Sequence, residues 1–290
     1  MSVVTSELVF SSETQISLPS PLVGDMDTTD LDCFDVECVV EAIGSSARAI
    51  RTILNRLRST PNIVTLYAKF TNVPPDVAKL TLQKGCRQMY NPDTRGMIVT
   101  IPGKPHDSIA GEFYTEFAIA AYHANLVRKF WSLARGRIQG TLCSKEPDGA
   151  WAPEQLPPGR SDTWPSIVLE VGVSESKKKL RADAAWWLAN SNGQVQVVIL
   201  ISVNQTVAVV TFESIVLQQP PTYIETRQSI VVSRTPGGAG QPITTVPIVS
   251  LRITVAELLC RPPNPGEIDL QIPVSSLELI ASAAWRWQGL

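Results

Sequence analysis

The amino-acid sequence predicts a mixed α/β fold, with a partly parallel central sheet and helices on both of its faces. Segments with helical and strand patterns follow one another in the order helix, strand, strand, helix, strand, strand. Residues 166–173 are almost all apolar, which is typical of a central strand buried on both faces. Residues 106–127 carry Ile109, Phe113 and Phe117 at intervals of four, which indicates a helix with one core face.

The other elements are predicted from the same two periodicities. Helical spacing of apolar residues predicts helices over residues 31–60, 76–90, 106–127, 174–189, 255–259 and 275–287. Alternating or continuous apolar residues predict strands over residues 63–70, 96–101, 166–173, 195–203, 207–212 and 251–254. Residues 135–143 and 148–152 are predicted as two strands or as a hairpin. Loops rich in proline, glycine or threonine are predicted over residues 153–162 and 216–246, the second with one strand near 230–232.

Individual residues justify the boundaries and the buried faces of these elements. Ser174 or Ser176 is suited to cap the helix that follows residue 173. Asn192-Gly193 predicts a turn between that helix and the next strand. The residues expected to pack inward are Ile50, Ile53, Leu54 and Leu57 in the first helix, Leu180, Ala184, Trp187 and Leu188 in the helix after residue 174, and Leu277, Ile280, Ala284 and Trp287 in the last helix.

The elements group into four regions. Residues 1–30 are predicted as a flexible tail and residues 31–84 as an N-terminal addition of helix and strand. Residues 85–262 form the predicted core, with residues 216–246 as a loop-rich insertion. Residues 263–290 contain the C-terminal amphipathic helix.

Composition narrows the class of protein. The chain has 290 residues, 44% of them hydrophobic and 18% charged, which fits a globular protein rather than a disordered one. Its net charge of -2 provides no overall basic field for nucleic acid. The five cysteines include no CxxC pair, so we expect them to be in the reduced state and to serve mostly as packing residues. Because no signal peptide and no membrane-spanning run are recognisable, we expect an intracellular protein, cytoplasmic or nuclear.

Two carboxylates carry the candidate chemistry. Asp148 follows Pro147 at the start of one predicted strand, and Glu170 lies in the middle of the next. A carboxylate buried in an apolar strand is costly without a partner, so a cation must meet Glu170. Asp148 and Glu170, with the backbone carbonyl of Val171, would bind Mg²⁺ or Mn²⁺, which prefer oxygen ligands. Such a metal activates water for phosphodiester hydrolysis.

These residues resemble the PD-(D/E)xK nuclease superfamily. More specifically, the chain resembles a family of restriction-endonuclease-like proteins that is abundant in cyanobacteria, and its fungal relatives. The matching segments are Ile101-Pro-Gly-Lys-Pro-His106, Pro147-Asp148, residues 168–176 around Glu170, the helix ending in Trp186-Trp187-Leu188, residues 195–203 and residues 251–258. The resemblance covers roughly residues 85–260 and implies a restriction-endonuclease-like mixed central sheet, flanked by helices, with additions at both ends.

The lysine that completes this superfamily's site is not at its usual positions. Gly172 stands two residues after the glutamate, where the simplest motif has lysine. In the resembling family the lysine often lies four residues before an aromatic, and Asp183 stands there, before Trp187. The substitutes on the following helix are Lys177 first and Arg181 second, against the alternative of a solvated basic helix start.

Three further side chains have two interpretations. The resemblance implies that an acidic residue of the first core helix orients the site, and Glu112 and Glu116 are the candidates; the alternative is surface carboxylates beside an apolar stripe. His106 either contacts phosphate or bonds to backbone at the helix start. The basic stretch from Arg48 to Arg58 is either a solvated face or a phosphate-binding face.

The sequence therefore predicts a Mg²⁺-dependent endonuclease, with DNA as the first candidate substrate and RNA as the second. A homodimer is one option for its assembly, and no membrane partner is expected. The candidate catalytic residues are Asp148, Glu170, Lys177, Arg181, Glu112 and Glu116. The alternative is a catalytically inactive nuclease-fold protein that serves as a binding or scaffolding module, which the missing lysine favours. An unrelated α/β domain, in which Glu170 pairs with Arg181 or Lys177, is the third hypothesis.

Overall fold

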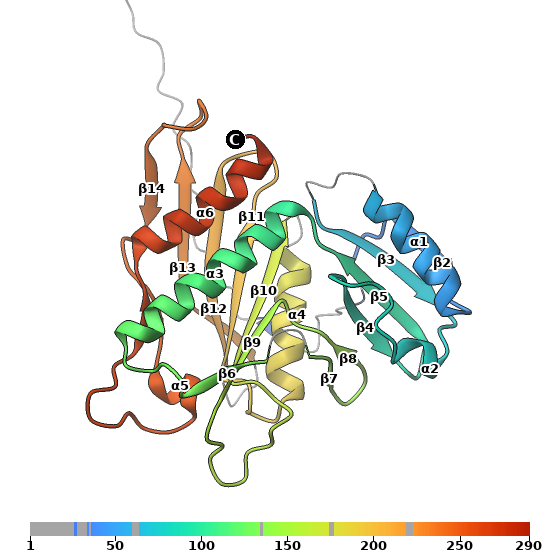
Figure 1. Ribbon diagram of the computed structural model, residues 1–290, viewed down its shortest axis with the longest axis horizontal. Coiled ribbons are helices and arrows are strands. Elements are labelled where there is room, and N and C mark those ends of the chain that lie inside the picture. Colours follow the sequence, from blue (N-terminus) through green and yellow to red (C-terminus); the bar gives the residue numbers. More distant parts are fainter. Residues whose placement is uncertain are drawn as a thin grey trace, which may run out of the picture.

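Two sheets lie side by side in the computed structural model, which describes residues 26–27, 34, 36–59, 64–133, 136–173, 177–218 and 223–290 (Figure 1). The larger sheet has eight strands in the order β1-β13-β12-β11-β10-β9-β6, with β14 pairing with β13. The smaller has six strands in the order β2-β3-β5-β4-β8-β7. A separate two-stranded ladder joins β15 to β16.

The smaller sheet is built mainly from the N-terminal part of the chain. One of its faces is covered by helix α1, whose Ile50 and Leu54 pack on Phe70 and Val99. Two short strands that follow α3 in sequence complete it. Its elements are β2 (Val40–Ile43), α1 (Ala47–Ser59), β3 (Leu66–Thr71), α2 (Pro75–Ala78), β4 (Arg87–Asn91), β5 (Gly96–Ile101), β7 (Ile138–Gln139) and β8 (Ser144–Lys145).

The larger sheet is mixed, since β10 runs parallel to β11 and antiparallel to β9. Its strands are β1 (Met26–Asp27), β6 (Phe130–Ser132), β9 (Gly149–Pro153), β10 (Ile167–Val173), β11 (Val197–Val203), β12 (Val209–Gln218), β13 (Tyr223–Arg234) and β14 (Ile243–Val246). The remaining elements are α3 (Lys104–His123), α4 (Lys177–Asn190), β15 (Leu251–Ile253), α5 (Val255–Leu259), β16 (Leu270–Ile272) and α6 (Val274–Gln288).

Side-chain alternation on β10 divides the core into two layers. Leu169 and Val171 face one side, where α3 and α6 pack. Val168 faces the other side, where α4 contributes Leu180 and Trp187. Because alternate residues of a strand point to the same face, Glu170 lies on the α4 side. The predicted fold class, a mixed central sheet with helices on both faces and additions at both ends, is confirmed.

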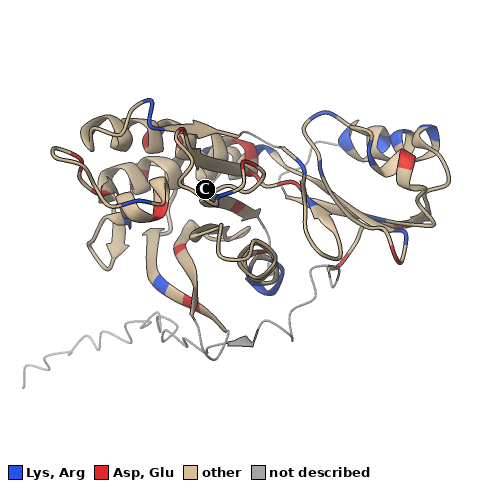
Figure 2. Ribbon diagram, turned by 90° about the horizontal axis from the view of Figure 1, so that it is seen from below, with Lys and Arg blue, Asp and Glu red and all other residues tan. Residues whose placement is uncertain are grey.

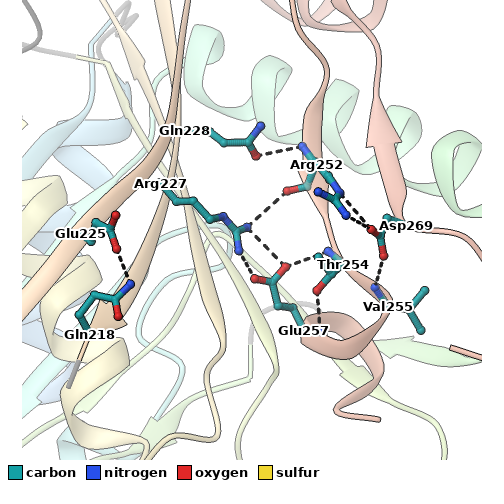
Figure 3. A network of polar contacts seen from close by, with 9 residues as sticks. All are labelled: Gln218, Glu225, Arg227, Gln228, Arg252, Thr254, Val255, Glu257 and Asp269. Carbon is teal, nitrogen blue, oxygen red and sulfur yellow. Dashed lines mark hydrogen bonds and ion pairs between the residues drawn. The ribbon is translucent and has the colours of Figure 1, made fainter. Parts of the chain in front are cut away.

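Polar contacts tie the long strand β13 to the C-terminal segment (Figure 3). The guanidinium of Arg227 pairs with Glu257, while Arg252 Nε donates to Asp269 at 2.9 Å. Thr254 caps α5 and shares a capping box with Glu257. These contacts link α5 and the β15–β16 ladder to strand β13.

Several predicted elements differ from the observed ones. Residues 76–90 are not one helix: α2 ends at Ala78, and β4 begins at Arg87 after Gly85, whose φ is +84°. Residues 216–246, predicted as loops with one strand, consist largely of β-strand in β12, β13 and β14. Part of the predicted first helix is the strand β2.

The last helix confirms its predicted span but not all of its predicted face. Leu277, Ile280 and Ala284 are buried as predicted. Trp287, by contrast, is 48% exposed, and the neighbouring Trp285 is the fully buried tryptophan. The predicted flexible tail and the caps Ser174 and Ser176 fall outside the residues that the structure describes, except for β1. No helix of the described chain is long and apolar enough to cross a membrane.

Candidate active site

Asp148 is held by groups from three different elements. It lies between β8 and β9, and its side chain is almost fully buried. Its Oδ2 accepts hydrogen bonds from His106 Nε2 at 3.0 Å and from the backbone N–H of Val171 at 2.9 Å. Its Oδ1 lies 3.1 Å from Nε of Arg87, which begins β4. Asp148 therefore connects the smaller sheet, helix α3 and strand β10.

His106 and Asp148 form a buried ion pair. Burial lowers the pKa of His106, but the charge of Asp148 and its hydrogen bond outweigh this and raise that pKa to about 9. Burial likewise raises the pKa of Asp148, while His106 and Arg87 together hold it well below its usual range. At neutral pH the imidazolium is consequently the donor and the carboxylate the acceptor.

Glu170 meets a lysine and a tryptophan inside the protein. Its Oε1 accepts a hydrogen bond from Trp187 Nε1 at 2.5 Å and lies 2.8 Å from Lys145 Nζ. The residue is 6% exposed. Burial raises the pKa of Glu170 to about 7; Lys145 opposes this rise, and the charges of Asp183 and Asp148 add to it. Burial is thus the main reason why Glu170 holds its proton more tightly than an exposed glutamate does.

Lys145 lies between two carboxylates. Its ammonium is 2.7 Å from Asp183 Oδ1, in addition to its contact with Glu170. Lys179, one helical turn before Asp183 on α4, also pairs with that carboxylate. The cluster as a whole contains three buried acidic residues, Asp148, Glu170 and Asp183, and four buried basic ones, Arg87, His106, Lys145 and Lys179.

These groups surround a small cavity between the two sheets. The cavity has a volume of about 30 Å³, room for about two water molecules. Tyr67 and Thr100 of the smaller sheet line it from one side, and Glu170 and Val171 of β10 from the other. Burial, followed by the charges of Asp183 and Asp148, raises the pKa of Tyr67, so its hydroxyl stays protonated.

The candidates on helix α4 lie elsewhere. Lys177 is exposed in the first turn of the helix. Arg181 pairs with Glu213 at 3.0 Å and donates to Thr226 Oγ1, also at 3.0 Å. Among the described contacts, no hydrogen bond or ion pair joins either residue to Asp148 or Glu170. Lys145 instead fills the place next to Glu170 that was predicted for Lys177 or Arg181.

The acidic candidates of α3 face solvent. Glu112 is exposed and Glu116 partly so, beside the buried stripe of Phe113 and Phe117. His106 on the same helix contacts neither solvent nor a backbone carbonyl through Nε2, which bonds to Asp148. The partner of that nitrogen is thus a carboxylate, and the hypothesis of a phosphate contact stays untested.

A side chain at position 172 would press on Leu180. Gly172 points to the α4 side of β10, like Glu170. A Cβ atom at position 172 would lie 2.8 Å from Leu180 Cδ1. No side chain fits there without displacing Leu180, so the positive charge must come from another element. The available signal in the sequence was Lys145 itself, three residues before Asp148.

No family profile matches the chain, and no curated protein matches it. Among solved structures, the chain is similar to the crystal structure of a candidate nuclease belonging to DUF820, from Anabaena variabilis. That similarity has a TM-score of 0.40 and 13% sequence identity, and covers 67% of this chain and 90% of the other. A likeness of this size carries no argument about function.

Proposed function

We propose that the protein is a nuclease that hydrolyses phosphodiester bonds in nucleic acid, with DNA as the first candidate substrate and RNA as the second. One observation carries the proposal: Asp148, Glu170 and Lys145 line one buried cavity. Burying charges contributes little to stability, even when they are paired. A concentration of buried ionisable groups with displaced pKa values around a cavity is instead characteristic of functional sites.

The residues fit a divalent metal by the type of their donor atoms. Mg²⁺ is commonly bound by one or two carboxylates and completes its shell with water. Asp148 and Glu170 supply two carboxylates, and the carbonyl of Val171 would be a third oxygen. The described residues contain no cluster of three or more His, Cys, Asp or Glu side chains suited to a metal.

Each residue of the chain has a distinct part in this proposal. A metal bound here would supply an activated water and offset negative charge in the transition state. Lys145 would stabilise the charge that develops on the phosphate oxygens, because its ammonium lies next to Glu170. His106 and Arg87 orient Asp148. Within the described part of the chain, no hydrogen bond or ion pair links Lys177, Arg181, Glu112 or Glu116 to this cluster.

A second candidate function is a catalytically inactive nuclease-fold module. One observation favours it: each carboxylate of the cluster already has an internal cation as partner. A cavity of about 30 Å³ is also too small for a phosphodiester group without movement of its walls. In this alternative, Lys145 and Arg87 replace the metal and the fold serves binding alone.

Cleavage of plasmid and single-stranded DNA, and of RNA, tests the proposal. The purified full-length chain is assayed with Mg²⁺, with Mn²⁺ and with EDTA. We expect metal-dependent cleavage that falls by about 100-fold or more in Asp148→Asn, Glu170→Gln and Lys145→Met. Lys177→Met, at an exposed position of α4, is the matched control and should retain activity. A folded wild-type protein that cleaves nothing under any of these conditions would establish the inactive module.

A further inference from the structure

Helix α1 presents a basic surface that the candidate active site does not use. The helix carries Arg48, Arg51, Arg56 and Arg58 and contains no acidic residue. All four side chains belong to exposed residues. Figure 2 shows these basic positions in blue along α1, in a chain whose overall net charge is -2. The helix therefore carries a local excess of positive charge.

The four arginines are distributed across the solvent-facing half of α1. Successive residues of a helix are rotated by about 100°, so Arg48 lies opposite the buried Ile50 and Leu54, with Arg56 on one flank and Arg51 on the other. Thr52, Asn55 and Ser59 lie along the same outer ridge as Arg48 and are exposed as well. The exposed surface thus consists of guanidinium groups and small hydrogen-bonding side chains.

These arginines are available to an outside anion. In the part of the chain that the structure describes, none of the four forms an ion pair with a carboxylate. Arg51 donates from Nε to the carbonyl of Leu82 at 3.1 Å, and Arg58 donates to the carbonyl of Lys84, which orders both side chains without neutralising them. The contrast is with Arg227 and Arg252, where a second hollow of the protein is lined by guanidiniums already paired with carboxylates.

We propose that the outer face of α1 binds the sugar-phosphate backbone of a nucleic acid duplex. Arginine together with Ser, Thr and Asn is the set of side chains that proteins use for phosphate contacts. A single strand would be held partly by stacking on aromatic rings, and α1 has no aromatic residue. An anionic membrane is disfavoured because the apolar face of α1 is buried in the core and cannot insert.

The basic surface of α1 and the cavity lie on opposite faces of the smaller sheet. Ile50 and Leu54 of α1 pack on the face of the smaller sheet that carries Phe70 and Val99. Tyr67 and Thr100, on neighbouring positions of the same strands, line the cavity. The duplex would consequently be anchored on one side of this sheet, away from the carboxylates. The inference rests on the proposed function for the kind of ligand, a nucleic acid, and adds a duplex-binding surface that is remote from the candidate active site.

Binding in EDTA tests the inference without any dependence on cleavage. A fluorescein-labelled DNA duplex is titrated with full-length protein, and its anisotropy is followed between about 50 and 200 mM salt. We expect Arg48→Gln/Arg56→Gln to reduce the slope of log K against log salt by about 1.8, and to weaken binding on the order of tenfold for each arginine near 0.1 M salt. Arg48→Lys/Arg56→Lys should retain most of the binding.

The matched control is Arg128→Gln/Arg286→Gln, which removes two exposed arginines outside the smaller sheet. Far-ultraviolet circular dichroism and thermal melting show whether each variant is folded. The proposal is overturned if the α1 variant and the control have the same salt slope, or if wild type prefers the single strand of the same sequence. It is also overturned if the α1 variant loses binding only to vesicles of anionic lipid. RNA and DNA duplexes, compared in parallel, identify which nucleic acid is bound.

Discussion

Lys145 and Asp183 form a buried ion pair that joins strand β8 to helix α4. Asp183 stands one turn before Trp187, where the resembling nuclease family often has lysine, and the lysine comes from strand β8. The two groups are 2.7 Å apart, and the same ammonium is 2.8 Å from Glu170. The carboxylate of Asp183 thus helps to hold the Lys145 ammonium beside Glu170.

Removing either partner of this pair should destabilise the protein strongly. Lys145→Met leaves the buried Glu170 without its lysine, while Asp183 keeps Lys179, and Asp183→Asn leaves two lysines with one carboxylate fewer. We expect each variant to cost about 3–5 kcal/mol in the free energy of unfolding. The double variant should cost less than the sum, because it removes both charges together. Urea denaturation measures all three. Lys177→Met is the control and should change stability by less than about 0.5 kcal/mol; additive losses would contradict a direct pair.

The stability of the protein should decrease in two pH windows. Glu170 has a raised pKa of about 7 against 4.5 ordinarily, so its stabilising contribution is complete below pH 4.5 and is lost as pH rises through 7. His106 has a pKa of about 9 against 6.5, so its contribution is complete below pH 6.5 and is lost as pH rises through 9. One pKa unit corresponds to about 1.4 kcal/mol, which predicts a decrease of roughly 3 kcal/mol in each window.

Two variants separate these windows. Glu170→Gln should flatten the decrease between pH 4.5 and 7, and His106→Gln the decrease between pH 6.5 and 9. Asp148, whose pKa is lowered, should act in the opposite sense, losing its contribution as pH falls below its ordinary value of 3.8. Urea denaturation across this pH range provides the measurement. An unchanged alkaline profile in His106→Gln would show that the imidazolium–carboxylate pair does not form.

The sequence could predict the two carboxylates but not the lysine, for a physical reason. Glu170 is recognisable because an acidic residue interrupts a continuous apolar strand. Lys145 belongs to the two-residue strand β8, which pairs with β4 of the smaller sheet. A strand of that length has no periodicity to read, and its side chain reaches Glu170 only because the two sheets meet. Lys145 stands only three residues before Asp148 in the sequence, but no local pattern shows that its side chain reaches Glu170.

The loop-rich prediction for residues 216–246 failed because composition outweighed alternation. Strand β13 alternates buried Ile224, Ile230 and Val232 with polar residues, as a half-exposed strand does. The prolines and glycines that suggested loops are concentrated at residues 219–221 and 236–242, between the strands. The predicted face of α6, residues 277, 280, 284 and 287, has helical spacing. The buried stripe also includes Ala281 and Trp285 and is rotated toward them, which leaves Trp287 at its margin near the end of the helix.

Gly172 should tolerate a side chain only if Leu180 is shortened. Gly172→Ala places a methyl group 2.8 Å from Leu180 Cδ1, and we expect a cost of about 1–3 kcal/mol in stability. Leu180→Ala alone should cost about 2–5 kcal/mol through the cavity it leaves. The double variant should cost clearly less than the sum, because the new methyl group occupies part of that cavity. Guanidinium denaturation decides; strict additivity would mean that the two positions do not touch.

The response to metal should distinguish the two candidate functions through Lys145. If Asp148 and Glu170 bind Mg²⁺ or Mn²⁺, the ion stabilises the folded protein by about 2.7 kcal/mol at a concentration of 100 Kd, which raises Tm. Because the Lys145 ammonium lies 2.8 Å from Glu170, it competes with a metal for that carboxylate. Lys145→Met should therefore bind metal more tightly than wild type while losing cleavage. Calorimetric titration and thermal melting of both proteins, with Glu170→Gln as the variant that should bind neither ion, measure the effect. No metal binding by folded wild type or by Lys145→Met would leave the inactive module as the function of this fold.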